Sequence, residues 1–386
     1  MKIRIVVAAV MAVAAATGGA RAQSATGYER TIVLSVPTPA PDFQVRVDLT
    51  PATFDYTRVL PGGADLRFLD STAITSFSYW IETWSSTGTS TIWVKVPTAG
   101  TSSLLMRYGT DATAPASDGT STFLFFDDFT ALTGWTVLRT GGWNGESLIG
   151  IEDGFSTVKI GDDANSLDGL WHKPLAVTDE IVLEARMKMT SRSPMFGFYS
   201  PTTANNPRFI LDCDGAGLDA WTDGASQYGW SYLAGTPAPL GSWVRIRVAK
   251  SGTSIAINRS YAAGTETRSM SSGAVASITS VMMGYQTFGT GEAHVDFFFV
   301  RRRAAVEPVS TMGTESPLGP PAPPISPAPP PGPPPPTTEV GGSDKKAGAG
   351  DGMKVCGFGA SGVTGGGLAL LVVMAATAAL LSRRSA

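Results

Sequence analysis

The chain has little of the chemistry on which histidine- or cysteine-based sites depend. Its 386 residues include two histidines, His172 and His294, and two cysteines, Cys213 and Cys356. The histidines lie far apart in sequence, so a histidine triad or a histidine metal cluster is not expected. Two cysteines are too few for a secreted disulfide scaffold. We predict that Cys213 is a buried, small apolar residue.

Charge is also scarce, and neither sign dominates. Charged residues make up 16% of the chain, the formal net charge is −3, and no basic stripe is present, so nucleic acid is not an expected partner. Gly, Ser and Thr are abundant instead, which is typical of exported β-proteins with many turns.

The N-terminus has the three parts of a secretory signal peptide over residues 1–22. Lys2 and Arg4 precede an apolar run at residues 5–17, and small residues at Ala20 and Ala22 predict cleavage after Ala22. The alternative is a transmembrane helix, but the run is shorter than the roughly 20 residues that a span needs.

The C-terminal segment, residues 353–386, predicts a transmembrane helix at about residues 364–382. Arginines at 383 and 384 end the apolar run and place the C-terminus on the cytoplasmic side. The order KVCG at residues 354–357, small residues, apolar helix and arginines resembles cysteine-containing sorting tags of myxobacterial surface proteins. The resemblance implies a sorting protease that processes the chain at Cys356. The alternative is a retained single-span anchor, and both place the protein at the cell envelope or outer surface.

Residues 304–352 are expected to form a disordered stalk. Residues 317–336 read PLGPPAPPISPAPPPGPPPP, and proline excludes both helix and sheet interiors. Polyproline II, at about 3.1 Å per residue, would hold the preceding domains some 60 Å from the membrane. The alternative is a ligand for a proline-binding domain.

Residues 26–120 predict an antiparallel β-sandwich. Short strand-like runs at residues 43–49, 66–69, 77–84, 91–96 and 104–108 are separated by turn residues. Alternation puts Trp80, Glu82 and Trp84 on one face. If the strands are neighbours, Glu82 would pair with Arg67 and Lys95 in a polar ladder under aromatic cover; the alternative makes Glu82 an acid or a ligand group.

Four motifs in this region resemble a domain of unknown function found in bacterial and archaeal cell-surface proteins. They are DLRF at residues 65–68, YWIETW at 79–84, WVKVP at 93–97 and RYG at 107–109. The resemblance implies an extracellular β-module that often precedes a lectin-like domain, and it brings no activity with it.

Residues 121–303 resemble a concanavalin A-like jelly roll, the sandwich of lectins and glucanases. The motifs are FDDF at residues 126–129, GSWVRIRV at 241–248 and VDFFFVRR at 295–302. The whole predicted fold is therefore all-β, with two antiparallel sandwich modules, a stalk and an anchor.

The jelly roll lacks the signature of a glycoside hydrolase. Such enzymes need two carboxylates in one cleft, and the glucanase pattern E-x-D-x-x-E is missing; Glu180 and Glu184 flank an apolar strand without a third carboxylate. We expect a non-catalytic surface protein that binds a glycan or another envelope component. The alternatives are a glycan-acting hydrolase with an unrecognised carboxylate pair and a purely architectural surface protein.

Aromatic residues are the candidate glycan ligands. Tyr228, Trp230 and Tyr232 alternate and would share one face of a strand. Trp221 and Trp143 are further candidates, and we expect both to lie in Gly- and Asp-rich loops. The alternative is that the triplet packs inward.

A structural calcium ion is the candidate cofactor. Asp127 or Asp128 and Asp296 would converge if the first and last strands of the jelly roll pair, and carboxylate oxygens suit Ca²⁺. The alternative is that these aspartates only cap turns.

Overall fold

A computed structural model describes residues 27–110, 114–139, 149–162, 169–189, 194–200, 208–211, 218–222, 225–226, 240–261, 264–271, 273–285 and 291–319. The predicted signal peptide and C-terminal segment lie outside these residues. So do the candidate residues Ala22, Trp143, Cys213, Tyr228, Trp230, Tyr232 and Cys356. Within the described ranges, no helix is long and apolar enough to cross a membrane.

The first module packs two antiparallel sheets against each other. Sheet A has the strand order β23 (Ser310–Pro317), β1 (Tyr28–Leu34), β7 (Ser103–Tyr108), β3 (Arg67–Leu69) and β4 (Ser76–Phe77). Sheet B has the order β2 (Phe43–Leu49), β6 (Ser90–Val96) and β5 (Tyr79–Thr83). In β2 the alternation of the sequence is realised directly, because Phe43, Val45, Val47 and Leu49 are buried in the core while Arg46 and Asp48 are exposed.

A buried carboxylate connects two of the sequence motifs inside this module. Asp65 is fully buried and accepts hydrogen bonds from the backbone N–H groups of Leu60 (2.8 Å) and Gly109 (2.6 Å). Gly109 has φ = 73°, a conformation that glycine adopts without strain. The DLRF and RYG motifs therefore fix the turn after β7 against the start of β3.

The second module is also a sandwich of two antiparallel sheets. Sheet C has the order β10 (Ile149–Glu152), β11 (Phe155–Asp162), β22 (Gly291–Arg302), β13 (Ile181–Met189), β18 (Trp243–Ser251), β19 (Ser254–Tyr261) and β20 (Gly264–Ser271), with β8 (Phe125–Asp127) also paired to β22. Sheet D has the order β17 (Ala225–Ser226), β16 (Leu218–Thr222), β15 (Arg208–Leu211), β14 (Pro194–Tyr199), β21 (Ser280–Tyr285), β12 (Gly169–Pro174) and β9 (Thr136–Arg139). The predicted all-β class, with two antiparallel sandwiches, is confirmed.

Helical structure in the described residues is limited to single turns. These are the 3₁₀ turns η1 (Tyr56–Arg58) and η2 (Pro61–Gly63), and the short helices α1 (Gly119–Thr122) and α2 (Gly273–Ala276). The first of the two helices lies in the connection from the first module to the second. Its N-cap is Asp118, whose carboxylate accepts from the Ser121 N–H at 3.2 Å, as N-cap side chains commonly do.

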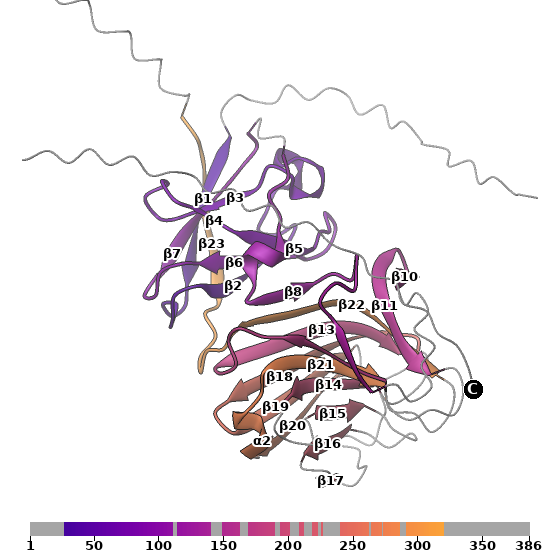
Figure 1. The fold of residues 1–386 in the computed structure, drawn as a ribbon. Coiled ribbons are helices and arrows are strands. Elements are labelled where there is room, and N and C mark those ends of the chain that lie inside the picture. The colour runs from indigo at the N-terminus through magenta and orange to yellow at the C-terminus, as the bar shows by residue number, and fades with distance from the viewer. Residues whose placement is uncertain are drawn as a thin grey trace, which may run out of the picture. The chain divides into compact units, whose positions relative to one another are not determined.

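The chain returns to the first module after the second is complete. Strand β23 pairs antiparallel with β1, with Tyr28 opposite Pro317 and Leu34 opposite Ser310, and Figure 1 shows it as a pale orange strand among the indigo and purple strands of sheet A. The jelly roll is therefore inserted between β7 and β23. The disordered stalk was expected to begin at residue 304, and this boundary is wrong because residues 310–317 are part of sheet A.

A carboxylate holds the returning strand in place. Glu315 accepts hydrogen bonds from Arg30, Arg58 and the Tyr108 hydroxyl. The sequence of β23, STMGTESP, has no apolar alternation, so pattern analysis missed it. The contacts of Glu315, together with the packing of Met312 on the apolar core, hold this strand.

Truncation tests the role of β23. A chain ending at residue 309 should unfold at a lower temperature than a chain ending at residue 323, because it loses the β1 pairing and the Glu315 contacts; the charged hydrogen bonds alone are worth about 2–3 kcal/mol. Differential scanning calorimetry of the two truncated chains and the full chain measures this. Equal melting temperatures for all three would show that β23 does not stabilise sheet A.

Candidate functional site

The two modules meet where the outward face of sheet B lies on the outer face of sheet C. On sheet B, the register places Arg46 opposite Trp93, and Trp93 opposite Trp80. On sheet C, Glu184 lies between Phe299 and Arg247 on the neighbouring strands. Cross-strand partners share a face, so each sheet presents a row of large polar and aromatic side chains to the other.

An aromatic cluster forms the apolar part of this junction. The indole of Trp80 makes edge contacts with Phe297 (5.4 Å between ring centroids) and Phe126 (5.0 Å). Phe123, from the connection, stacks on Phe299 at 4.1 Å. Trp93 contacts Phe299 at 5.6 Å. Rings from both modules and from their connection thus bury one another, and each such pair contributes about 0.5–1.5 kcal/mol beyond area burial.

A bulge in β5 changes which side chains reach the junction. The register between β5 and β6 shifts between Ile81 and Thr83, at Glu82. Past the bulge the alternation is reversed, so Trp84 packs on the core of the first module and against Tyr56 at 5.3 Å. The expectation that Trp84 shares a face with Trp80 and Glu82 is therefore wrong.

Glu82 bridges the two modules. Its carboxylate accepts a hydrogen bond from the Trp93 indole N–H (2.8 Å) and forms an ion pair with Arg245 of β18. The expected pairing with Arg67 does not form, because Arg67 lies on sheet A and donates to backbone carbonyls, including that of Ala114 at 2.7 Å. The predicted ladder of Glu82 with Arg67 and Lys95 is therefore wrong: Glu82 lies beside the Trp93 indole, but the cation that pairs with it is Arg245 of the second module.

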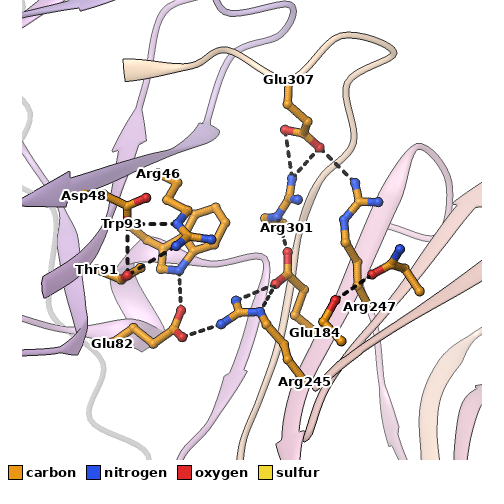
Figure 2. A network of polar contacts seen from close by, with 12 residues as sticks. Arg46, Asp48, Glu82, Thr91, Trp93, Glu184, Arg245, Arg247, Arg301 and Glu307 are labelled. Carbon is orange, nitrogen blue, oxygen red and sulfur yellow. Dashed lines mark hydrogen bonds and ion pairs between the residues drawn. The ribbon is translucent and has the colours of Figure 1, made fainter. Parts of the chain in front are cut away.

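The central anion of the junction is Glu184 of β13. Its buried carboxylate accepts from Arg245 Nε at 3.0 Å and from Arg301 Nε at 2.7 Å (Figure 2). Burial alone would raise the pKa of Glu184, but the charges of Arg301 and Arg245 outweigh it and lower the pKa to about 2. Burial would lower the pKa of Arg245 and of Arg301, but Glu184 outweighs it, together with Glu82 at Arg245 and Glu307 at Arg301, and both pKa values are raised. Glu184 therefore stays ionised at any physiological pH.

A cleft of about 480 Å³ opens beside this network. Sheet B contributes the exposed Arg46–Asp48 ion pair (3.0 Å), and sheet C contributes Arg247, Asn258 and Ser260. Asn258 lies opposite Arg247 in the register of β18 and β19. The connection from β22 to β23 closes one side with Glu307, Pro308 and Val309. Both modules are thus needed to build the cleft.

Gln44 of β2 forms hydrogen bonds from the first module to the connection and to the end of β22. Its side-chain N–H₂ donates to the carbonyl of Thr122 (3.0 Å), and its carbonyl accepts from the Arg302 N–H (2.9 Å). The amide is almost fully buried, and both of its ends are satisfied, as a buried polar group requires.

The predicted calcium ligands have other partners. β8 pairs with β22 as expected, with Asp127 opposite Phe298, but Asp127 accepts from the Trp135 indole and from Lys173, both at 2.8 Å. Asp128 accepts from the Thr130 N–H at 3.2 Å. Asp296 forms an ion pair with Arg186, although burial raises the pKa of its carboxyl. In the ranges that the structure describes, no three His, Cys, Asp or Glu side chains gather as metal ligands; calcium binding stays a prediction that these contacts do not support.

Of the predicted aromatic ligands, Trp221 is the one whose backbone is described. It lies in strand β16, opposite Arg208 and Ser226, so the predicted loop position is wrong. The ring of His172 contacts that of Tyr199 in a tilted arrangement, with 4.3 Å between the centroids, and its Nδ1 lies 3.2 Å from the Ser280 hydroxyl. Burial lowers the pKa of His172.

Sequence reasoning missed the arginines that make the site. In β18 the residues Trp243, Arg245 and Arg247 alternate with buried Val244, Ile246 and Val248. That alternation shows that the arginines share one face. It does not show that the face is covered by another module, which is why Arg245 and Arg301 were not proposed.

One protein-family model matches part of the chain. Residues 62–145 match a family model described as a domain of unknown function (DUF2341). The matched stretch crosses from the first module into the second and contains Trp80, Trp93, Phe123 and Phe126, the aromatic residues that meet at the junction. No curated protein matches the chain.

Several solved structures resemble the chain in fold at low sequence identity. One comes from work titled "Prominent members of the human gut microbiota express endo-acting O-glycanases to initiate mucin breakdown" (13% identity, 47% of this chain and 100% of that one, TM-score 0.34). Another is lectin II from Ulex europaeus (8%, 47% and 98%, 0.33). A third is a GH43 protein from Bacillus licheniformis (12%, 56% and 47%, 0.35).

Glu184→Gln tests whether the junction depends on its central anion. The substitution leaves Arg245 and Arg301 with a buried, uncompensated charge, so it should lower the free energy of unfolding by about 3–5 kcal/mol. Urea unfolding of the full chain measures this. The control is Glu29→Gln, which breaks the more exposed Glu29–Arg107 pair on sheet A and should cost under about 1 kcal/mol. Equal effects of the two variants would contradict the assignment.

The stability of the chain should also depend on pH through Glu184. Its folded pKa of about 2 lies below the usual 4.5, so its contribution, about 3 kcal/mol, is complete above pH 4.5 and is lost as the pH falls toward 2. The gap in unfolding free energy between the native chain and Glu184→Gln should therefore narrow steadily below pH 4.5. A gap that stays constant down to pH 2 would rule out an ionised Glu184 as the stabilising group.

Proposed function

We propose that this protein is a non-catalytic, glycan-binding protein of the cell envelope, and that its binding site is the cleft between sheet B and sheet C. The observation that carries the proposal is the composition of the cleft. Its walls combine exposed, paired polar groups with an apolar edge, and they come from both modules.

The polar lining suits sugar hydroxyls. Planar side chains with paired donors and acceptors, such as the Arg46–Asp48 pair and the Asn258 amide, can bind adjacent hydroxyl groups of a ring. The Ser260 hydroxyl donates to the Asn258 side-chain carbonyl at 3.1 Å, and the Asn258 amide nitrogen donates to the Thr267 hydroxyl at 3.1 Å, so both ends of the amide are held in place. Pro308 and Val309 offer an apolar edge to the C–H face of a sugar. A volume of about 480 Å³ lies in the usual range for small-ligand sites, about 300–1,000 Å³.

The carboxylates of the junction favour binding over hydrolysis. A general acid needs a pKa near the working pH, whereas the pKa of Glu184 is held at about 2. Glu82 and Glu184 are both paired with Arg245, so neither is a free nucleophile. A glycosidase needs two carboxylates with distinct roles on either side of the scissile bond, and this pair has neither role open to it.

The location of the protein is part of the same proposal. The signal-peptide pattern of residues 1–22, the proline-rich stretch and the apolar C-terminal segment support export and anchoring at the cell surface. The compact unit that contains both modules ends at residue 323, so the stalk would start beyond sheet A. Any calcium requirement is tested by adding chelator to the binding assay below.

Glycan-array binding of the full chain is the direct test. We expect binding that is lost, by at least about tenfold, in the double variant Asn258→Ala and Ser260→Ala. Trp230→Ala is the comparison variant, since it lies in the aromatic triplet predicted from the sequence. Loss in Trp230→Ala with retention in the cleft variant would move the site to the triplet. Absence of binding to every glycan would favour a purely architectural protein.

A further inference from the structure

We propose that Arg247 and Arg301 form a carboxylate-binding subsite in the cleft, that Glu307 occupies it in the free protein, and that the ligand is an acidic saccharide whose uronate group displaces Glu307. The inference rests on the proposed function, because it names the class of glycan for the same cleft.

The carboxylate of Glu307 is held as a bound ligand acid would be. Both of its oxygens accept from Arg301 Nη1, at 3.0 and 3.2 Å, and one also accepts from Arg247 Nη2 at 3.0 Å (Figure 2). Two guanidinium groups converging on one carboxylate are a common mode of acid recognition, because the planar forks match the geometry of the two oxygens.

The two cations are built into the fold, and the anion is not. Arg301 is 4% exposed and forms an ion pair with Glu184. Its guanidinium carbon also lies 5.1 Å from the centre of the Trp93 ring. Arg247 lies in the middle of sheet C, between β13 and β19. Glu307 is 37% exposed, about as much as Arg247 at 34%, but it lies on the connection between β22 and β23 and not in a sheet. Its neighbour Val306 is 66% exposed, whereas Pro308 is buried and Val309 is held by two hydrogen bonds with Ser35. Displacement of Glu307 would therefore be a rotation of its side chain and not a movement of the whole segment.

Charge balance shows what would replace Glu307. The ion-pair network contains Arg46, Arg245, Arg247 and Arg301 against Asp48, Glu82, Glu184 and Glu307. Moving Glu307 away leaves one guanidinium charge without a partner at the wall of the cleft. Arg301 keeps its bond to Glu184, whereas Arg247, which is 34% exposed, loses Glu307. An entering carboxylate would restore the bonds that Glu307 made to both arginines, which a neutral sugar would not.

The neighbouring groups extend the subsite toward a sugar ring. Asn258 lies directly opposite Arg247, and Ser260 lies opposite Arg245. A uronate carboxylate on the arginine pair would therefore have an amide and a hydroxyl beside it for ring hydroxyl groups. This combination fits a uronic acid better than an isolated small anion.

The test compares acidic and esterified forms of the same sugars. Trimers of galacturonate, glucuronate and mannuronate, and their methyl esters, are titrated calorimetrically into the full chain. We expect an acid to bind and its methyl ester to bind at least about tenfold more weakly. Glu307→Gln removes the internal competitor, so affinity for the acid should rise about tenfold. Arg247→Gln should lower it about tenfold. The matched control is Glu29→Gln, which removes a carboxylate from an ion pair on sheet A and should change neither affinity.

The outcomes separate this inference from the function it rests on. Equal binding of acids and esters, lost in the Asn258 and Ser260 variant, would overturn the acidic subsite and leave the glycan cleft intact. Unchanged or weakened acid binding in Glu307→Gln would show that Glu307 is a structural partner only, and would overturn the displacement. Absence of binding to any sugar, acidic or neutral, would overturn both proposals.

Discussion

The junction depends on the neutralisation of one buried carboxylate. Glu184 lies in the middle of sheet C, under another module, where an isolated charge would be prohibitive. Arg245 and Arg301 make it tolerable, and each of these arginines has a second carboxylate of its own, Glu82 or Glu307. Because Glu82 comes from the first module and Glu307 from the returning connection, the neutralisation is complete only when all three parts of the chain are in place.

The aromatic cluster and the ion network stabilise the junction in different ways. The cluster around Trp80 and Phe299 removes apolar surface from water and supplies non-directional attraction. The ion network sets the relative orientation of sheets B and C at the junction, because hydrogen bonds between charged groups depend on geometry. Gln44 adds a neutral bond between β2 and the end of β22. Together these contacts connect the first module to the jelly roll in the described part of the chain.

Much of the fold follows from residue patterns, and the site largely does not. Alternation in β2 and β18 predicted strands and faces correctly, and the FDDF and VDFFFVRR motifs predicted sandwich strands that do pair. The bulge at Glu82 does not follow from the sequence, because the alternation of side chains in β5 up to Ile81 is the same with or without an extra residue. β23 was missed since its sequence has no apolar alternation and its pairing depends on Glu315 and distant arginines. The cleft needs the relative placement of two modules, which no local pattern encodes.

The pairing of β1 with β23 gives the chain an unusual order of parts. Because Tyr28 lies opposite Pro317, the first module begins and ends at one place, and the whole jelly roll is topologically a long loop of that module. A different sandwich could replace this loop in another protein without altering how the chain enters or leaves the first module, provided that its outer face offers rings to Trp80 and Trp93 and a cation to Glu82. The first module would then be a constant scaffold that can accept different inserted domains.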